Sequence, residues 1–404
     1  GGAGHADPST TIGFAWQTDD GTLASEVAWG KTPDPAGWTA TDRAAGVTWL
    51  TPEGDLNGKG DERMHEAYLC GLSPSTTYYY RVGGGASGAE VWSEVYAFTT
   101  TPGAGDGKIV IGVTGDSRGQ QNDAWRVLQR RMLTAGTTMQ LFSGDMVNLA
   151  PDQGEWEQWL DSAWKDEGGA PLTLGQILSL SAHGNHDNHT ALFFGNLVLP
   201  QDTAAYAKYE ELFFSVDVGP AHILVIDDAF IVNPDGDPDY KPALTAFLDA
   251  DLTAAAANRA KVPWVIAMHH HPEYSSSSHG TDADVLRGRA YFAPIWDKYH
   301  VDLVLAGHDH NYERTKPLTG PTDAPTVHAD AKDGTVYVVC AGSGADAYSA
   351  GTSNFTELSH DYKDGAALGL YGLLTVEKAT LKLEAHELRA DKSDPIFDTL
   401  TITK

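Results

Sequence analysis

The chain has 404 residues, of which 41% are hydrophobic and 10% aromatic, a composition typical of packed globular proteins and not of disordered ones. One hydrophobic core rarely supports so long a chain, so we expect two domains. Lysine and arginine number 27 against 55 aspartates and glutamates, which gives a net charge of −28. This charge repels polyanions and makes nucleic acid and anionic membranes poor partners. No apolar run approaches the length of a membrane helix, and residues 1–9 lack the apolar core of a signal peptide.

The chain has two cysteines, Cys70 and Cys340, which are too few for a disulfide framework or a cysteine-rich metal site. Cys70 shares one side of an expected strand with Tyr68, and Cys340 shares one with Val338. We therefore predict two buried free thiols, with a disulfide between the domains as the alternative.

The first part of the chain, residues 1–103, indicates an all-β sandwich. Ile12, Phe14 and Trp16 alternate with small residues, and the same period of two recurs at 78–82. Such alternation, punctuated by glycine, proline and serine, predicts short strands with one buried face. The last strand is expected at 95–100, followed by a linker at 102–107.

The pattern changes in residues 104–404, where uninterrupted apolar runs alternate with helical spacing, as in an α/β fold covered on both faces. Strands are expected at 109–113, 139–143, 177–182, 223–227, 262–268 and 301–306, and helices at 122–135, 155–164, 241–257 and 287–299. The last strands follow one another without helices, at 336–340, 370–376, 381–388 and 397–402. We expect these four to form a second sheet that closes a two-sheet β-sandwich flanked by helices.

Five of the expected strands end in residue types that bind metals. They lead to Asp116, to Asp145, to Asn185 with His186 and Asp187, to His269, His270 and His271, and to His308 with His310. Ligands of an open α/β sheet bind beyond the carboxyl ends of its strands, so these side chains should converge. A mixed oxygen and imidazole set suits Fe, Mn or Zn and differs from the all-oxygen sites of Ca²⁺. Six or seven ligands are too many for one tetrahedral ion and fit two metals that share a carboxylate.

The order Gly-Asp, Gly-Asp, Gly-Asn-His-Asp, His-x-Pro, Gly-His-x-His resembles that of the calcineurin-like metallophosphoesterases. The stretch Gly307 to Arg314, GHDHNYER, is similar to the purple acid phosphatase version of the last motif. Residues 72–78, LSPSTTY, look like a corner of fibronectin type III-like domains, which precede the catalytic domain in that group. The resemblance therefore implies a fibronectin III-like domain at 1–103 and a metallophosphoesterase domain at 104–404.

The resemblance also implies a ligand set. Asp145 would bridge two metals; the first would be held by Asp116 and His310, and the second by Asn185, His270 and His308. His270 is selected because the family's ligand stands two residues before the proline. His269 would then face away from the metals, and His271 would help to line the pocket.

Two positions depart from the family pattern. Purple acid phosphatases carry a tyrosine three residues after the bridging aspartate, where this chain has Asn148. Many other members carry a histidine two residues after the first aspartate, where this chain has Arg118. The first metal is thus expected to have three protein ligands, with Asn148 or water completing its shell, and the purple colour is not expected.

The implied reaction is the attack of a metal-activated hydroxide on phosphorus. His186 would stabilise the phosphoryl group or protonate the leaving oxygen, with Asp187 orienting its imidazole. His279, nine residues after His270, and Arg118 would contact substrate; an exposed loop histidine and a surface ion pair are the alternatives.

We therefore expect an enzyme that hydrolyses small-molecule phosphate esters, monoesters before diesters. A phosphodiesterase or nucleotidase with the same metal core is one alternative, and a non-catalytic binding module is another. Arg314 is expected to form a buried ion pair that holds the 308–310 loop. The resemblance implies a secreted or periplasmic location, and the sequence leaves the oligomeric state open.

Overall fold

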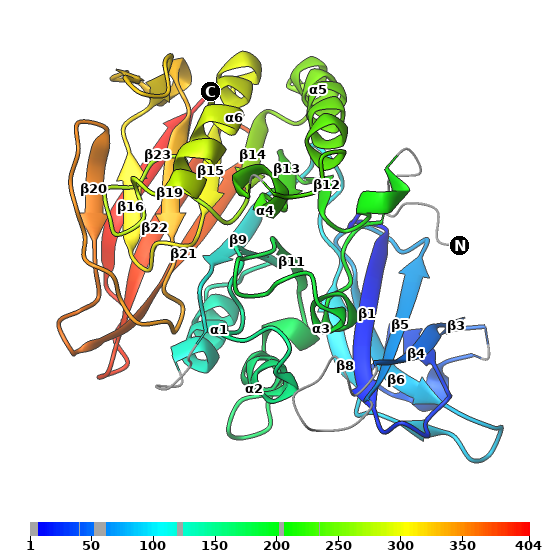
Figure 1. Ribbon diagram of the computed structural model, residues 1–404. Helices are drawn as coiled ribbons and strands as arrows, with labels where there is room; N and C mark the ends of the chain where they lie inside the picture. The colour runs from blue at the N-terminus through cyan, green and yellow to red at the C-terminus, as the bar shows by residue number, and fades with distance from the viewer. Residues whose placement is uncertain (1–6, 40, 52–61, 119–123, 202–205, 234) are drawn as a thin grey trace.

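The computed structural model describes residues 7–39, 41–51, 62–118, 124–201, 206–233 and 235–404. A β-rich N-terminal domain lies beside a larger α/β domain (Figure 1). The first domain packs a three-stranded sheet, in the order β1 (Thr11–Thr18), β5 (Glu62–Cys70), β4 (Val47–Thr51), on a second sheet. That second sheet holds β3 (Arg43–Ala45), β2 (Glu26–Gly30), β6 (Thr77–Gly84), β7 (Val91–Trp92) and β8 (Tyr96–Thr99). The β-rich character of this domain confirms the prediction, and the boundary at 103/104, between β8 and the next strand, stays a prediction.

The second domain contains two large sheets. The six-stranded sheet has the order β11 (Leu178–Ser181), β10 (Met139–Phe142), β9 (Ile109–Thr114), β21 (Ala367–Glu377), β22 (Thr380–Arg389), β23 (Ile396–Thr403). The seven-stranded sheet has the order β12 (Phe213–Val218), β13 (Ala221–Ile226), β14 (Trp264–Met268), β15 (Leu303–Ala306), β19 (Val336–Cys340), β16 (Tyr312–Thr315), β20 (Thr356–His360). Strands β9 to β11 run parallel to one another, as do β13, β14, β15 and β19.

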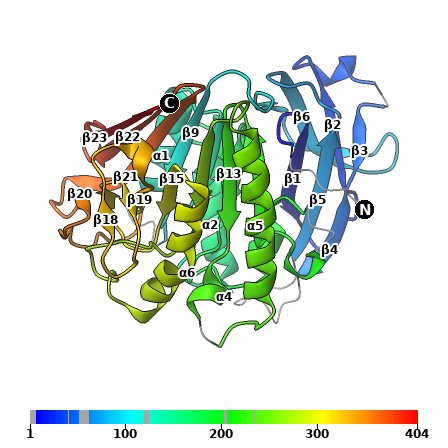
Figure 2. The same cartoon turned by 90° about the horizontal axis from the view of Figure 1, so that it is seen from above.

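The described helices of this domain are α1 (Ala124–Thr134), α2 (Gln153–Trp164), α3 (Ala191–Asn196), α4 (Ala229–Val232), α5 (Tyr240–Asn258) and α6 (Ala283–Tyr299). Figure 2 shows α5 and α6 side by side over the strands β13 and β15. Residues 122–123 of the helix expected at 122–135 lie outside the described residues.

The last four strands do not form one sheet, which corrects the expectation from the sequence. Strand β19 joins the seven-stranded sheet beside β15, whereas β21 pairs antiparallel with β9 and extends the six-stranded sheet. Hydropathy patterns show which face of a strand is buried but not which neighbour it hydrogen-bonds, because strand pairing is decided by contacts distant in sequence.

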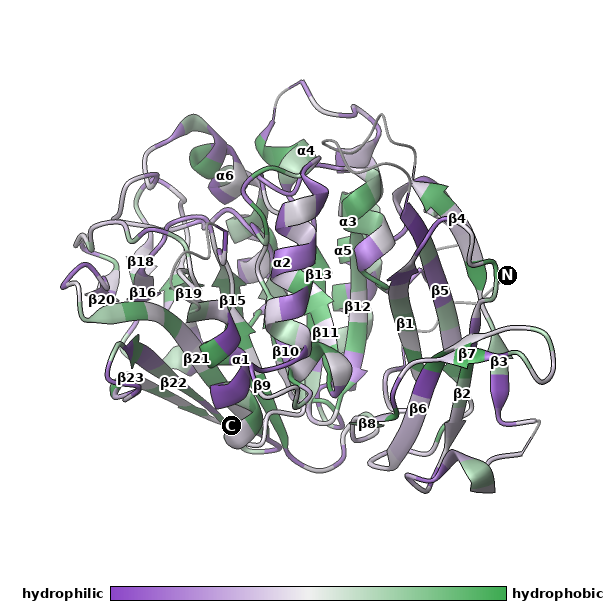
Figure 3. Ribbon diagram, turned by 90° about the horizontal axis from the view of Figure 1, so that it is seen from below, coloured by the Kyte–Doolittle hydropathy of each residue, from purple (hydrophilic) through white to green (hydrophobic). Residues whose placement is uncertain are grey.

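The core between the sheets explains the uninterrupted apolar runs. Ile111 of β9 and Ile266 of β14 belong to the cluster buried between the two sheets. Their neighbours point the other way, so that Val265 packs under α5 and α6 with Phe292 and Trp296. In Figure 3 the central strands are largely hydrophobic, while α1 and α2 carry hydrophilic residues as well. Strands covered on both faces need apolar residues at every position.

The two domains are in direct contact. The hydroxyl of Tyr80 donates to the carbonyl of Gly175 at 3.0 Å, and the rings of Tyr96 and Trp164 meet edge to face at 4.6 Å. The N-terminal domain thus packs on α2 and the segment after it.

Both cysteines are free, but only Cys340 is buried. The expectation of two buried thiols is therefore wrong for Cys70, which is the last residue of β5 and is exposed where the strand leaves the sandwich core. Among the described residues, no helix is long and apolar enough to cross a membrane.

Candidate metal centre

The expected ligands come from both large sheets, not from the edge of one open sheet as the sequence indicated. Asp116 and Asp145 follow β9 and β10, whereas His270 and His308 follow β14 and β15. The two loops of the seven-stranded sheet are tied together, since the amide of Gly307 donates to the carbonyl of His270 at 2.9 Å.

Three of these residues have left-handed backbone conformations, which are uncommon outside glycine. The φ angles are 55° at Asp116, 61° at Asp145 and 70° at His308. Each such position costs free energy and persists only when the surroundings enforce it, and such residues cluster at functional sites. The backbone therefore marks the strand ends where the ligand types stand.

Four side chains converge on the place implied for the second metal. The Oδ1 atom of Asn185 lies 3.0 Å from Nε2 of His270 and 3.0 Å from Nδ1 of His308. The Oδ1 atom of Asp145 lies 3.5 Å from the same nitrogen of His270. Carboxylate, amide oxygen and two imidazoles are the donor set of first-row metals.

The hydrogen bond of His270 turns a lone pair toward this place. His270 donates from Nδ1 to the carbonyl of Ser143 at 2.8 Å, so that its Nε2 presents a lone pair to the oxygen of Asn185. Two electron pairs that face each other at 3.0 Å repel, and a cation bound between them would remove the repulsion. Burial and the neighbouring histidines hold the pKa of His308 well below its usual range, so its ring stays neutral as a ligand must.

The place implied for the first metal has fewer donors. The Nε2 atom of His310 lies 3.5 Å from Oδ1 of Asp116, and its Nδ1 donates to the carbonyl of Asp346 at 2.7 Å. Oδ2 of Asp145 is buried and has no hydrogen-bond partner among the described residues, and Nε of Arg118 lies 3.6 Å from it. An unsatisfied buried carboxylate oxygen requires a cation or a donor. The donors of both places thus fit metal ions, with the first less completely surrounded.

Burial alone would raise the pKa of Asp145 because it penalises the charged carboxylate. The electrostatic effect of the neighbouring His270, His186 and Arg118, together with the amide of His186 that donates to Asp145 at 2.8 Å, outweighs burial and lowers this pKa. Asp145 is therefore ionised at neutral pH, as a bridging ligand has to be.

Asp187 has a different role from the one predicted. Its buried carboxylate accepts the amides of Asp145, Met146 and Gly184 at 2.8 to 2.9 Å and holds the loop of Asp145 in place. The imidazole of His186 is oriented instead by the carbonyl of Asn148, to which Nδ1 donates at 2.8 Å. The reason is that the carboxylate of Asp187 is already engaged by these amides, and His186 takes its partner from the loop after Asp145. Asn148 itself is exposed and contributes its main chain to this contact.

The three histidines of the triplet make different contacts. His269 points away from the donors, hydrogen-bonds Asp228 and Glu273, and stacks on Phe292. His271 donates from its ring and its main chain to Asp228 at 2.9 and 2.7 Å, and its ring lies 4.4 Å from that of His308. Asp228 thus binds the residues on both sides of His270 and fixes this loop. No sequence motif predicted this role.

His279 and Arg118 both lie at the donors. The ring of His279 is 4.6 Å from that of His308, and its Nδ1 contacts Asp282 at 2.9 Å. Arg118 contacts His186, His310 and the hydroxyl of Tyr348, the last at 3.3 Å. Sequence reasoning missed Tyr348, whose ring stacks on His310 at 4.1 Å, because it stands in an irregular loop without a motif.

A cavity of about 830 Å³ opens beside the first place, a size that accommodates a small organic ligand. Arg118 and His310 form its floor, and Asn148, Tyr348 and Lys363 stand around it. A phosphate group at the donors would therefore have room for the group esterified to it.

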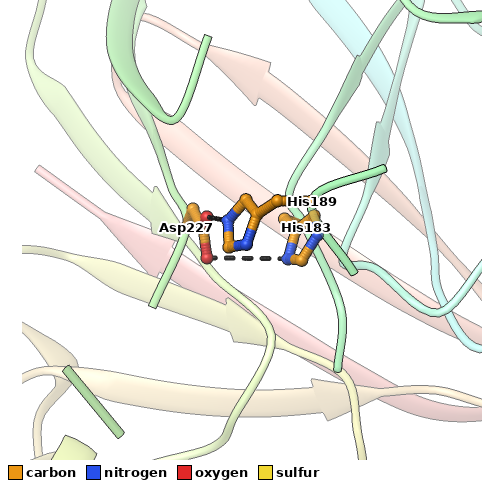
Figure 4. A group of neighbouring side chains, drawn as sticks. All are labelled: His183, His189 and Asp227. Carbon is orange, nitrogen blue, oxygen red and sulfur yellow. Dashed lines mark hydrogen bonds and ion pairs between the residues drawn. The ribbon is translucent and has the colours of Figure 1, made fainter. Parts of the chain in front are cut away.

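A second cluster lies next to the donors, formed by His183, His189 and Asp227. Figure 4 shows both imidazoles turned toward Asp227. Their rings are stacked at 4.1 Å with only 9° between the planes. A metal binds imidazole in the plane of the ring, and two stacked parallel planes share no such point. We interpret the cluster as a clamp that ties the loop of Asn185 to the end of β13.

The expected ion pair of Arg314 is also present. Its guanidinium makes two hydrogen bonds to Asp398, at 2.6 and 2.9 Å, and the hydroxyl of Tyr312 donates to the same carboxylate at 2.7 Å. The pair anchors β16, directly after the loop that carries His310, to β23.

Comparisons with known proteins show the family of both domains. Residues 3–100 match the family model of the purple acid phosphatase N-terminal domain, and residues 109–312 match that of the calcineurin-like phosphoesterases. The chain is 24% identical over 379 residues to "Probable inactive purple acid phosphatase 1" of Arabidopsis thaliana, covering 84% of this chain and 58% of that protein. It is 29% identical over 272 residues to a purple acid phosphatase of Glycine max, covering 63% of this chain and 53% of that protein.

Among solved structures, purple acid phosphatase PPD1 from yellow lupin (Lupinus luteus) seeds has a TM-score of 0.76 at 19% identity, covering 98% of this chain and 72% of that one. At this identity the likeness concerns the fold. The chain spans less than two thirds of the length of the two curated relatives, 58% and 53%. The match to residues 109–312 extends over half of the chain, so this protein belongs to the calcineurin-like phosphoesterases and carries a purple acid phosphatase N-terminal domain in front.

Proposed function

We propose that the protein hydrolyses small-molecule phosphate esters, monoesters before diesters, with two ions of Fe, Mn or Zn. Asp145 would bridge them, with the remaining ligands from Asp116, Asn185, His270, His308 and His310. The observation that carries the proposal is that Oδ1 of Asn185 lies 3.0 Å from both Nε2 of His270 and Nδ1 of His308, with Asp145 beside them. When bound, the ions supply the Lewis acidity that neutralises the charge developing on the phosphoryl oxygens.

The chain's own residues supply the rest. Nδ1 of His186 donates to Asn148, so Nε2 is left to accept from Arg118. Once the guanidinium has moved away, a proton taken up at Nε2 could pass to the leaving oxygen. The guanidinium of Arg118 can donate two parallel hydrogen bonds to a phosphate group. His279, beside His308, would contact the substrate from the opposite side.

A screen of substrates with measured metal content tests the proposal. The purified protein should turn over aryl phosphate monoesters faster than diesters, lose activity with a chelator and recover it with metal. Asp145→Asn should reduce both metal content and turnover while the fold is kept. A preference for diesters would assign a phosphodiesterase instead, and a preference for nucleoside monophosphates over other monoesters would assign a nucleotidase.

A non-catalytic binding role is the second candidate, because a relative matching 84% of the chain is named as probably inactive and the first place lacks the family's tyrosine or histidine. Full metal loading without turnover on any ester would favour it over hydrolysis. A secreted or periplasmic location also stays a proposal, which fractionation of the source cells would test.

A further inference from the structure

The guanidinium of Arg118 lies among the donors of the first place. Its Nη1 contacts Nε2 of His186, and its Nη2 lies 3.1 Å from Nε2 of His310 and 3.3 Å from the hydroxyl of Tyr348. Its Nε is 3.6 Å from Oδ2 of Asp145, and the side chain is only 16% exposed. Arg118 therefore contacts two of the three residues expected to hold the first metal.

A metal and this guanidinium cannot occupy the place together. Nδ1 of His310 is engaged with the carbonyl of Asp346, so the ring has one lone pair left, at Nε2. That lone pair meets Nη2 of Arg118 at 3.1 Å. A first-row metal would bind along the same direction at about 2.1 Å, roughly 1 Å from the arginine nitrogen. The ion can enter only if the guanidinium leaves.

The metal ion and the guanidinium are both cations that compete for the carboxylate of Asp145. Arginine stays protonated in proteins, so Arg118 neutralises the buried carboxylate of Asp145 when no metal does. The second place has no such competitor: no arginine or lysine contact is found with Asn185, His270 or His308 among the described residues. The two places therefore differ in what an incoming ion has to displace.

We propose that Arg118 is a built-in cation that holds the first metal place in the metal-free protein, so that the two places fill in order, the second before the first. This inference rests on the proposed function, because it takes both places as metal sites. The displaced guanidinium has the adjoining cavity of about 830 Å³ to move into, where Tyr348 also stands. There it would face the phosphate oxygens of a substrate. Binding of the first metal would thus free the guanidinium of Arg118 to bind phosphate.

Metal titration of the chelator-treated full chain tests the proposal without measuring turnover. Calorimetry with Mn²⁺ alone should resolve a tight and a weak site in the wild type. Arg118→Ala should tighten the weak site by about tenfold or more, in the range that residues contacting metal ligands typically control, and change the tight site much less. Arg118→Gln, of similar length without the charge, gives the same comparison if the alanine variant folds poorly. Arg130→Ala removes an exposed arginine on α1 and serves as the control.

Three results would overturn the proposal. The first is an unchanged weak-site Kd in both Arg118 variants, and the second is simultaneous filling of two equal sites in the wild type. The third is a variant that still takes up a single ion. Ordered binding of two ions by a protein that hydrolyses no ester would leave this inference standing and refute the proposed function instead, so the two failures are distinguishable.

Discussion

Gly184→Ala should disable the site through geometry alone. A Cβ atom at this position would lie 2.2 Å from the amide nitrogen of Asp145 and 2.3 Å from its Oδ1. Ordinary contacts begin at 3.4 Å, so Asp145 would have to retreat by about 1 Å. Main-chain atoms cannot swing aside as the end of a flexible side chain can. A misplacement of this size at a reacting centre can cost about 100-fold in rate.

The assay is kcat/KM on an aryl phosphate, with metal content measured on the same preparation. We expect a loss of about 100-fold in kcat/KM together with weakened metal binding. Gly288→Ala in α6 is the matched control, since its Cβ would meet only Val232 at an ordinary 3.4 Å. It should be neutral or stabilise the helix by about 0.5–1 kcal/mol. If Gly184→Ala keeps both metals and turns over within about threefold of the wild type, the assignment of Asp145 as the bridging ligand is wrong.

Three further predictions concern metal choice, stability and colour. His270→Ala should lose metal content and activity. His269→Ala removes the partner of Asp228 and Glu273, so it should lower the unfolding midpoint and keep more metal than His270→Ala. The reverse order of metal loss would refute the choice of His270 as the ligand. His222 is buried, which disfavours its charge, but hydrogen bonds to its two neighbouring aspartates raise its pKa to about 9. Its folded pKa exceeds the usual 6.5, so about 3 kcal/mol of stability is present below pH 6.5 and lost as the pH rises through 9. In urea unfolding, the stability difference between the wild type and His222→Gln should therefore shrink between about pH 6 and pH 10. A stability difference that stays the same over this range would contradict the prediction. Metal-replete protein should show no intense visible band, because Asn148 cannot act as a phenolate; a band abolished by Tyr348→Phe would show that this tyrosine reaches the metal.

The donor types were visible in the sequence because they stand at the ends of strands. A buried strand needs apolar residues, and the polar residues that follow it, such as Asp116 and Asp145, mark where the chain leaves the core. The resemblance to the family's His-x-Pro motif likewise selected His270 over His269 as the expected ligand. The change from alternation to continuous apolar runs predicted a sandwich followed by an α/β domain. All of this information is local, since side-chain periodicity depends only on the residue and its position in its own element.

Tertiary structure decided what these residues meet. The donors come from two facing sheets, and β19 pairs in a different sheet from β21, because strand partners are chosen by contacts between distant segments. The same reason hid the role of Tyr348, which reaches His310 from a loop without a motif. It also hid the position of Arg118, which the sequence places two residues after Asp116 but which only the folded chain brings to the lone pair of His310. The sequence alone predicted which residue types follow which strands. The competition between Arg118 and a metal arises only in the folded protein, where the loops that carry them meet.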